Sequence, residues 1–61
     1  MTYEQVRLRA LAMWREREMR FPAFTRRMQP DEWDHATGSW AAMVSAAAEA
    51  IRRESAACPA P

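Results

Sequence analysis

The chain has 61 residues, with nine basic residues, all Arg, against eight Asp and Glu, for a net charge of +1. A chain of this length holds one small domain, which excludes most enzymes. Hydrophobic residues make up 49% of the sequence, but 13 residues are Ala and only five are Leu, Ile or Val. The predicted core is therefore thin, and we expect a partner or a second copy of the chain to supply part of the stability.

Location and redox state follow from a few further features. No apolar run approaches the roughly 18 residues of a membrane span, and the first residues lack the basic-then-apolar order of a signal peptide. We therefore expect a cytoplasmic protein with no membrane partner. Cys58 is the single cysteine and stands in a terminal Cys-Pro-Ala-Pro. A reduced thiol in the tail is the preferred interpretation, and an intermolecular disulfide is the alternative.

The first predicted helix covers about residues 3–20. Thr2 and Gln5 have the spacing of a capping box, and no Gly or Pro follows until Pro22. The apolar residues of this segment form two stripes on roughly opposite sides of the helix. A helix that is apolar on two sides needs two neighbours, so the second neighbour is either another chain or a short segment that folds over it.

A connector follows between Pro22 and Pro30, with room for a short helix. Pro30 is the expected first residue of a second helix, over about residues 30–54. Large or neutral residues recur there at a 4-3-4-3-4 spacing, at Trp33, Thr37, Trp40, Val44, Ala47 and Ile51. This spacing passes through Gly38 without losing phase and favours one long helix. The alternative is a break at Gly38, with Ser39 capping a new helix.

The predicted fold is all-α, a small antiparallel helical hairpin of two main helices. Residues 1–55 form a single helical domain, and residues 56–61 a flexible C-terminal tail. The predicted core consists of Val6, Met13, Trp14, Phe21, Phe24, Trp33, Trp40, Val44 and Ile51.

Residues with catalytic or metal-binding chemistry are scattered along this sequence. His35 and Asp31 share a helix face at i,i+4, and Asp34 is adjacent, but two ligands do not close a metal site. A solvated histidine near a polar helix start is the preferred interpretation. We expect no catalytic site, no metal and no cofactor.

Charge is divided unevenly between the two halves of the chain. Residues 1–27 contain seven Arg and three Glu, a balance of +4, and residues 28–61 contain two Arg and five acids, a balance of −3. One interpretation is that the hairpin pairs these charges across its two halves. The functional interpretation takes Arg20, Arg26 and Arg27 as a patch for phosphate or for an acidic protein surface.

The three tryptophans are the second informative feature. Trp33 and Trp40 lie seven residues apart on one predicted face and are expected in the core. Trp14 stands among arginines at the edge of its stripe, so it could instead form an exposed binding face with Tyr3 and Met13. The predicted partner-binding residues are Tyr3, Trp14, Arg17, Arg20, Arg26 and Arg27.

These features favour a non-enzymatic protein-interaction module that occludes a surface on a larger protein or nucleoprotein complex. Inhibitors of host machinery from phages and mobile elements act in this way, the anti-CRISPR proteins among them, although no motif of such a family is present. One alternative is an Arg-rich homodimeric regulator that binds nucleic acid. The other is a phage assembly chaperone or a structural homo-oligomer.

Overall fold

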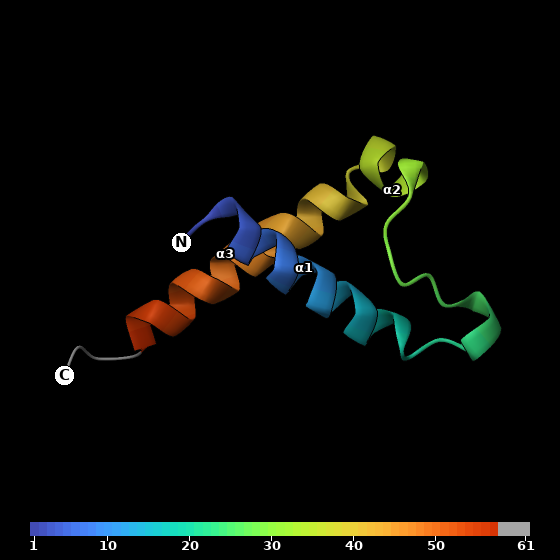
Figure 1. The fold of residues 1–61 in the computed structure, drawn as a ribbon, viewed down its shortest axis with the longest axis horizontal. Coiled ribbons are helices and arrows are strands. Elements are labelled where there is room, and N and C mark those ends of the chain that lie inside the picture. The colour runs from blue at the N-terminus through green and yellow to red at the C-terminus, as the bar shows by residue number, and fades with distance from the viewer. Residues whose placement is uncertain (58–61) are drawn as a thin grey trace.

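The computed structural model describes residues 1–57 and is entirely helical over that range. Helix α1 (Tyr3–Glu18) leads through a 3-10 helix, η1 (Ala23–Thr25), to the short helix α2 (Glu32–Thr37) and then to α3 (Ser39–Ala57). Figure 1 shows α1 and α3 as the two main helices, which run in opposed senses and cross. The predicted all-α helical hairpin is therefore confirmed.

Helix α1 begins as the sequence predicts and ends slightly earlier. The Gln5 backbone N–H donates to Thr2 Oγ1 (3.2 Å), and the Thr2 N–H donates to Gln5 Oε1 (2.9 Å), which completes the capping box. The α-helix ends at Glu18. Arg20 and Phe21 then donate to the carbonyls three residues earlier, because Phe21 precedes a proline and cannot continue the helix.

The second predicted helix is divided at Gly38, so the single helix over residues 30–54 is wrong and the alternative break is observed. Gly38 has φ +83°, in the left-handed region that ends helices. Helix α2 also starts later than expected, since its N-cap is Asp31 and its first residue is Glu32. The 4-3-4-3-4 spacing was misleading because only its α3 members face α1: Trp33 and Thr37 of α2 are exposed, whereas the later members lie in or against the core.

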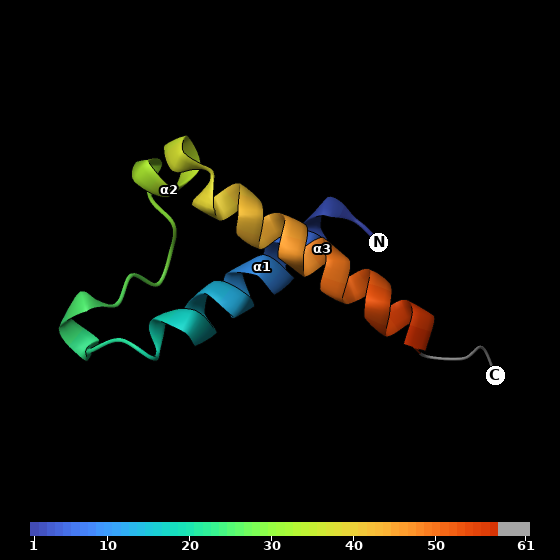
Figure 2. The ribbon, with the colours of Figure 1, turned by 180° about the vertical axis from the view of Figure 1, so that it is seen from behind.

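The core lies where α1 and α3 cross, a point that both views show (Figures 1 and 2). Val6 and Ala10 of α1 meet Ala47 of α3, and all three are buried. Small side chains at this point let the two helix backbones approach closely. Partly buried side chains surround the contact, namely Met13, Trp40, Met43, Val44, Ala48 and Ile51.

Three residues of the predicted core lie outside it. Phe21 is 47% exposed, Phe24 is 91% exposed and Trp33 is 64% exposed. The break at Gly38 turns the short α2 away from the direction of α3, and the connector carries the two phenylalanines beyond the crossing point. The radius of gyration is 13.4 Å, against about 10–11 Å for a compact domain of this length. The two helices are thus openly arranged and bury only a small core, which agrees with the thin core predicted from composition.

The described C-terminal part extends α3 to Ala57, which is two residues into the segment predicted as a tail. Cys58, predicted as a reduced thiol, lies outside the described residues. Among residues 1–57, no helix has the length and apolar character needed to cross a membrane.

Substitution of Gly38 distinguishes the broken helix from a continuous one. In a continuous helix, Gly38→Ala would stabilise the protein by about 1 kcal/mol. At φ +83° the same change forces Ala into the left-handed region, although no atom lies within 4 Å of the added Cβ. We expect Gly38→Ala to lower the free energy of unfolding by about 1–2 kcal/mol, measured by urea denaturation. Gly38→Asn should lose less, because Asn tolerates this conformation, and a stabilised Ala variant would contradict the break.

Candidate interaction surface

Trp14 is the largest fully buried side chain of the described residues, with 0% exposure. Its indole Nε1–H donates to the carbonyl of Arg27 at 2.7 Å, which joins α1 to the end of the connector. Its ring meets that of Trp40 edge to face, with centroids 6.0 Å apart. Trp14 therefore holds three parts of the chain together. Its place in the predicted core is confirmed, and the alternative role in an exposed binding face is wrong.

Arg27 and Asp34 form the polar side of this junction. Arg27 Nη1 donates to Asp34 Oδ2 at 2.8 Å, and the Asp34 carboxylate also accepts from the Asp31 backbone N–H (3.0 Å) and the Ser39 hydroxyl (3.2 Å). Asp34 is 1% exposed, so these bonds replace the water that it has lost. The Asp34 carboxylate thus links α2 to the connector through Arg27 and to the first residue of α3 through Ser39.

The same bonds set the pKa of Asp34. Burial alone raises the pKa of a carboxyl group. Here the hydrogen bonds from the Asp31 N–H and from the Arg27 guanidinium outweigh burial and lower the pKa of Asp34 from 3.8 to about 2. The carboxylate stays ionised at neutral pH and keeps its bonds to the connector.

Glu18 holds the connector from the α1 side. Its side chain is almost fully buried, and Oε1 accepts from the Arg27 backbone N–H at 2.8 Å. The Arg17 guanidinium lies over the face of Trp14, 4.3 Å from the ring centroid, and covers it from solvent. Arg27 is thus bonded through its backbone to both Trp14 and Glu18.

The connector itself is fixed by hydrogen bonds rather than by a core. Arg26 Nε donates to the Phe21 carbonyl (2.9 Å), and its Nη2 donates to the Met19 carbonyl (3.2 Å). Thr25 donates to the Pro22 carbonyl through both its N–H and its hydroxyl, each at 2.9 Å. The connector therefore presents its side chains from a defined backbone.

Several large apolar side chains stand exposed on this part of the chain. Within ten consecutive residues, Met19 is 56% exposed, Phe21 47%, Phe24 91% and Met28 40%. These four side chains, together with Arg20, are called the connector surface below. Single exposed apolar residues are ordinary, but a cluster on a fixed backbone is typical of a contact site.

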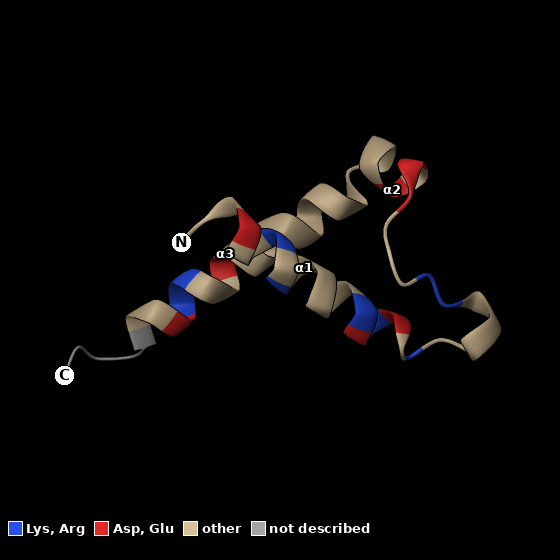
Figure 3. Ribbon diagram, in the orientation of Figure 1, with Lys and Arg blue, Asp and Glu red and all other residues tan. Residues whose placement is uncertain are grey.

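The charge around the connector surface is positive (Figure 3). Arg26 is bonded to backbone carbonyls, so no carboxylate neutralises it, and Arg20 makes no ion pair within residues 1–57. By contrast, Arg27 is paired with Asp34, and Arg9 is paired with Glu54 of α3. The predicted pairing of charges across the two halves is thus observed for Arg9 and Arg27 and leaves the connector basic.

The structure does not gather the predicted partner-binding residues into one surface. Tyr3 is 71% exposed and lies at the far end of α1. Arg17 covers Trp14, and Arg27 holds Asp34, so both contribute to the fold. Of the predicted set, Arg20 and Arg26 lie on or beside the connector surface.

The exposed side chains of the connector surface were missed because apolar residues near a helix end are ordinarily assigned to the core. The signal that could have found them is the pair of prolines, Pro22 and Pro30, which separates this segment from both helices. The preferred interpretation of His35 as a solvated histidine agrees with its exposure, and Asp31 caps α2 and pairs with Arg27. Over residues 1–57, no three His, Cys, Asp or Glu side chains gather as metal ligands would.

Replacing two tryptophans tests which of them stabilises the fold. Trp14→Phe removes the donor to the Arg27 carbonyl and part of a fully buried ring, so we expect a loss of about 2 kcal/mol or more in the free energy of unfolding. Trp33→Phe alters an exposed side chain and should change it by less than about 0.5 kcal/mol. Urea denaturation followed by circular dichroism measures both. A larger loss for Trp33→Phe than for Trp14→Phe would contradict the burial of Trp14 and the exposure of Trp33.

The low pKa of Asp34 predicts a specific acid dependence. Because the unfolded chain takes up this proton near pH 3.8 and the folded protein only near pH 2, protonation favours unfolding as the pH falls through this window. We expect the wild type to be more stable than Asp34→Asn above pH 4, and the difference to shrink between pH 4 and pH 2. Denaturation at a series of pH values measures it, and a difference that stays constant down to pH 2 would contradict the assignment.

Comparison with known proteins assigns no family. No protein-family model, curated protein or solved structure matches the chain.

Proposed function

We propose that this protein is a non-enzymatic interaction module that binds a larger protein through the connector surface and occludes the site it covers. The observation that carries the proposal is Phe24, which is 91% exposed on a backbone fixed by hydrogen bonds. Exposed aromatic side chains of this kind are frequent hot spots of protein interfaces.

The fixed backbone makes the surface effective despite its small size. A flexible loop loses conformational entropy when it binds, whereas a connector whose carbonyls are already bonded to Arg26 and Thr25 loses less. Met19, Phe21 and Met28 supply further exposed apolar area within the same ten residues as Phe24. The uncompensated charges of Arg20 and Arg26 favour a partner surface that carries carboxylates.

Occlusion is the mode of action that such a surface supports. A rigid apolar projection flanked by arginines can fill a pocket on a larger protein and prevent its normal ligand from entering. Phage and mobile-element inhibitors of host machinery, of the anti-CRISPR type, work by this principle, and we place the protein in that functional class as part of the proposal.

The test is a quantitative capture experiment with the tagged chain and a lysate of its native or target cell, with and without nuclease treatment. We expect a protein retained in stoichiometric amount by the wild type, and Phe24→Ala to weaken its binding at least tenfold, because truncated aromatic hot spots cost that much. Circular dichroism should show unchanged helix content, since Phe24 buries almost nothing in the fold.

Leu8→Ala is the matched control, because Leu8 is apolar, 52% exposed and lies on α1 outside the connector surface. It should retain the partner as the wild type does. Equal retention by Phe24→Ala would refute the connector surface as the binding site. Recovery of nucleic acid alone, lost on nuclease treatment, would favour the nucleic-acid regulator, and retention of the chain by itself would favour the homo-oligomer.

A further inference from the structure

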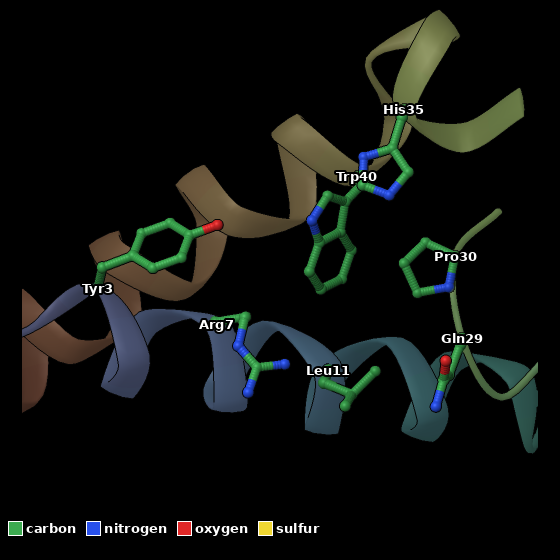
Figure 4. A pocket seen from close by; sticks show the side chains of 7 residues that line it. All are labelled: Tyr3, Arg7, Leu11, Gln29, Pro30, His35 and Trp40. Atoms are coloured by element: carbon green, nitrogen blue, oxygen red, sulfur yellow. The ribbon is translucent and has the colours of Figure 1, made fainter. Parts of the chain in front are cut away.

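A concave feature lies beside Trp40, between α1, the end of the connector, α2 and the start of α3 (Figure 4). Its volume is about 320 Å³, at the lower end of the range for ligand pockets, about 300–1,000 Å³. It is lined by Tyr3, Arg7, Leu11, Gln29, Pro30, His35 and Trp40. This feature, called the Trp40 cleft below, contains none of the residues of the connector surface.

The Trp40 cleft combines an apolar floor with several hydrogen-bond donors. Leu11, Pro30 and the Trp40 ring form the apolar part, and Figure 4 shows the indole of Trp40 extending from α3 towards Leu11 of α1. The donors come from different elements: the Tyr3 hydroxyl, the Arg7 guanidinium, the Gln29 amide, the His35 ring and the Trp40 indole N–H.

These donors are largely without acceptors in the protein. Within residues 1–57, the one hydrogen bond made by the polar side chains of the cleft runs from Arg7 Nη2 to Glu4 Oε1 at 3.0 Å. Neither Asp nor Glu lines the cleft. Glu4 is 64% exposed, and an exposed ion pair of this kind contributes little, so it leaves the Arg7 guanidinium available to a second carboxylate.

We propose that the Trp40 cleft binds a carboxylate carried on a small apolar body. Arg7 bonds the carboxylate, the Tyr3 hydroxyl and the Trp40 indole N–H lie beside it as further donors, and the apolar part packs on Leu11 and Trp40. A free aromatic acid offers this chemistry, and so does an Asp or Glu side chain next to a hydrophobic residue in a peptide. The volume of about 320 Å³ has room for one such group.

The experiment is an NMR titration of the ¹⁵N-labelled full-length chain with 3-phenylpropionate, in parallel with its neutral amide. We expect the Trp40 indole N–H signal to shift with a dissociation constant on the order of millimolar, as a ligand of this size allows. The amide should bind at least tenfold more weakly, because it lacks the charge-assisted bonds. The Trp14 indole N–H is the internal control, since it is buried and already bonded to the Arg27 carbonyl.

Arg7→Gln should weaken binding of the carboxylate at least tenfold. Arg52→Gln is its matched control, because Arg52 pairs with Glu49 at the same i,i+3 spacing (2.9 Å) but does not line the cleft. Capped dipeptides, Glu-Leu against Gln-Leu, form the second arm: tighter binding of Glu-Leu than of 3-phenylpropionate identifies a peptide ligand, and the reverse identifies a free acid. The proposal is overturned if neither carboxylate shifts Trp40, if the amide binds equally well, or if Arg7→Gln binds as the wild type does. None of these outcomes depends on the connector surface.

Discussion

The fold depends on one hydrogen bond and the ring that makes it, from Trp14 Nε1 to the carbonyl of Arg27. Two helices that cross at Val6, Ala10 and Ala47 bury little area. The crossing alone therefore leaves the C-terminal end of α1 and the N-terminal end of α3 apart. The Trp14 ring fills the space between them, and burying a side chain of this size contributes about 4–6 kcal/mol. Its N–H then fixes where the chain returns from the connector. In a domain whose total stability is about 3–9 kcal/mol, such a residue decides whether the connector has a defined position at all.

Arg27 links this hydrogen bond to the position of α2. Its backbone is bonded to Trp14 and Glu18, and its side chain reaches Asp34. A buried carboxylate that lost this guanidinium would be costly, so the position of α2 follows from that of Arg27. The exposed face of the connector is a result of the same bonds. Arg26 and Arg27 bond to the chain itself, and Phe21 and Phe24 are exposed on the connector that these bonds fix.

The sequence predicted what local rules determine. The capping box at Thr2, the end of α1 before Pro22 and the all-helical class follow from short-range patterns. The sequence placed both Trp14 and Trp33 in the core, which is right for Trp14 and wrong for Trp33, and it left an exposed role for Trp14 open, because burial at a helix edge depends on where the returning chain lies. The position of the break was available as an alternative, since Gly38 followed by Ser39 permits either a continuous or an interrupted helix. The interrupted form is the one observed, and in it Asp34 of α2 bonds to Arg27 of the connector, a contact that the local pattern around Gly38 does not show. The Trp40 cleft combines residues of α1, the connector, α2 and α3, which no single helical period brings together.

The shortness of α2 has a consequence for how the protein moves. A helix of six residues has no stability of its own in water, so it exists only while its contacts persist. Those contacts run through Arg27 at one end and through the left-handed Gly38 at the other. Loss of the Asp34 bonds would therefore release the end of the connector and α2 together, while the crossing of α1 and α3 remains. We expect residues 29–38 to open as one cooperative unit at a lower free energy than global unfolding, because Arg26, the Arg27 backbone and the Met28 carbonyl stay bonded on the α1 side. Pro30 and His35 lie in this unit and line the Trp40 cleft, so the same local opening that exposes α2 also opens one wall of the cleft to solvent.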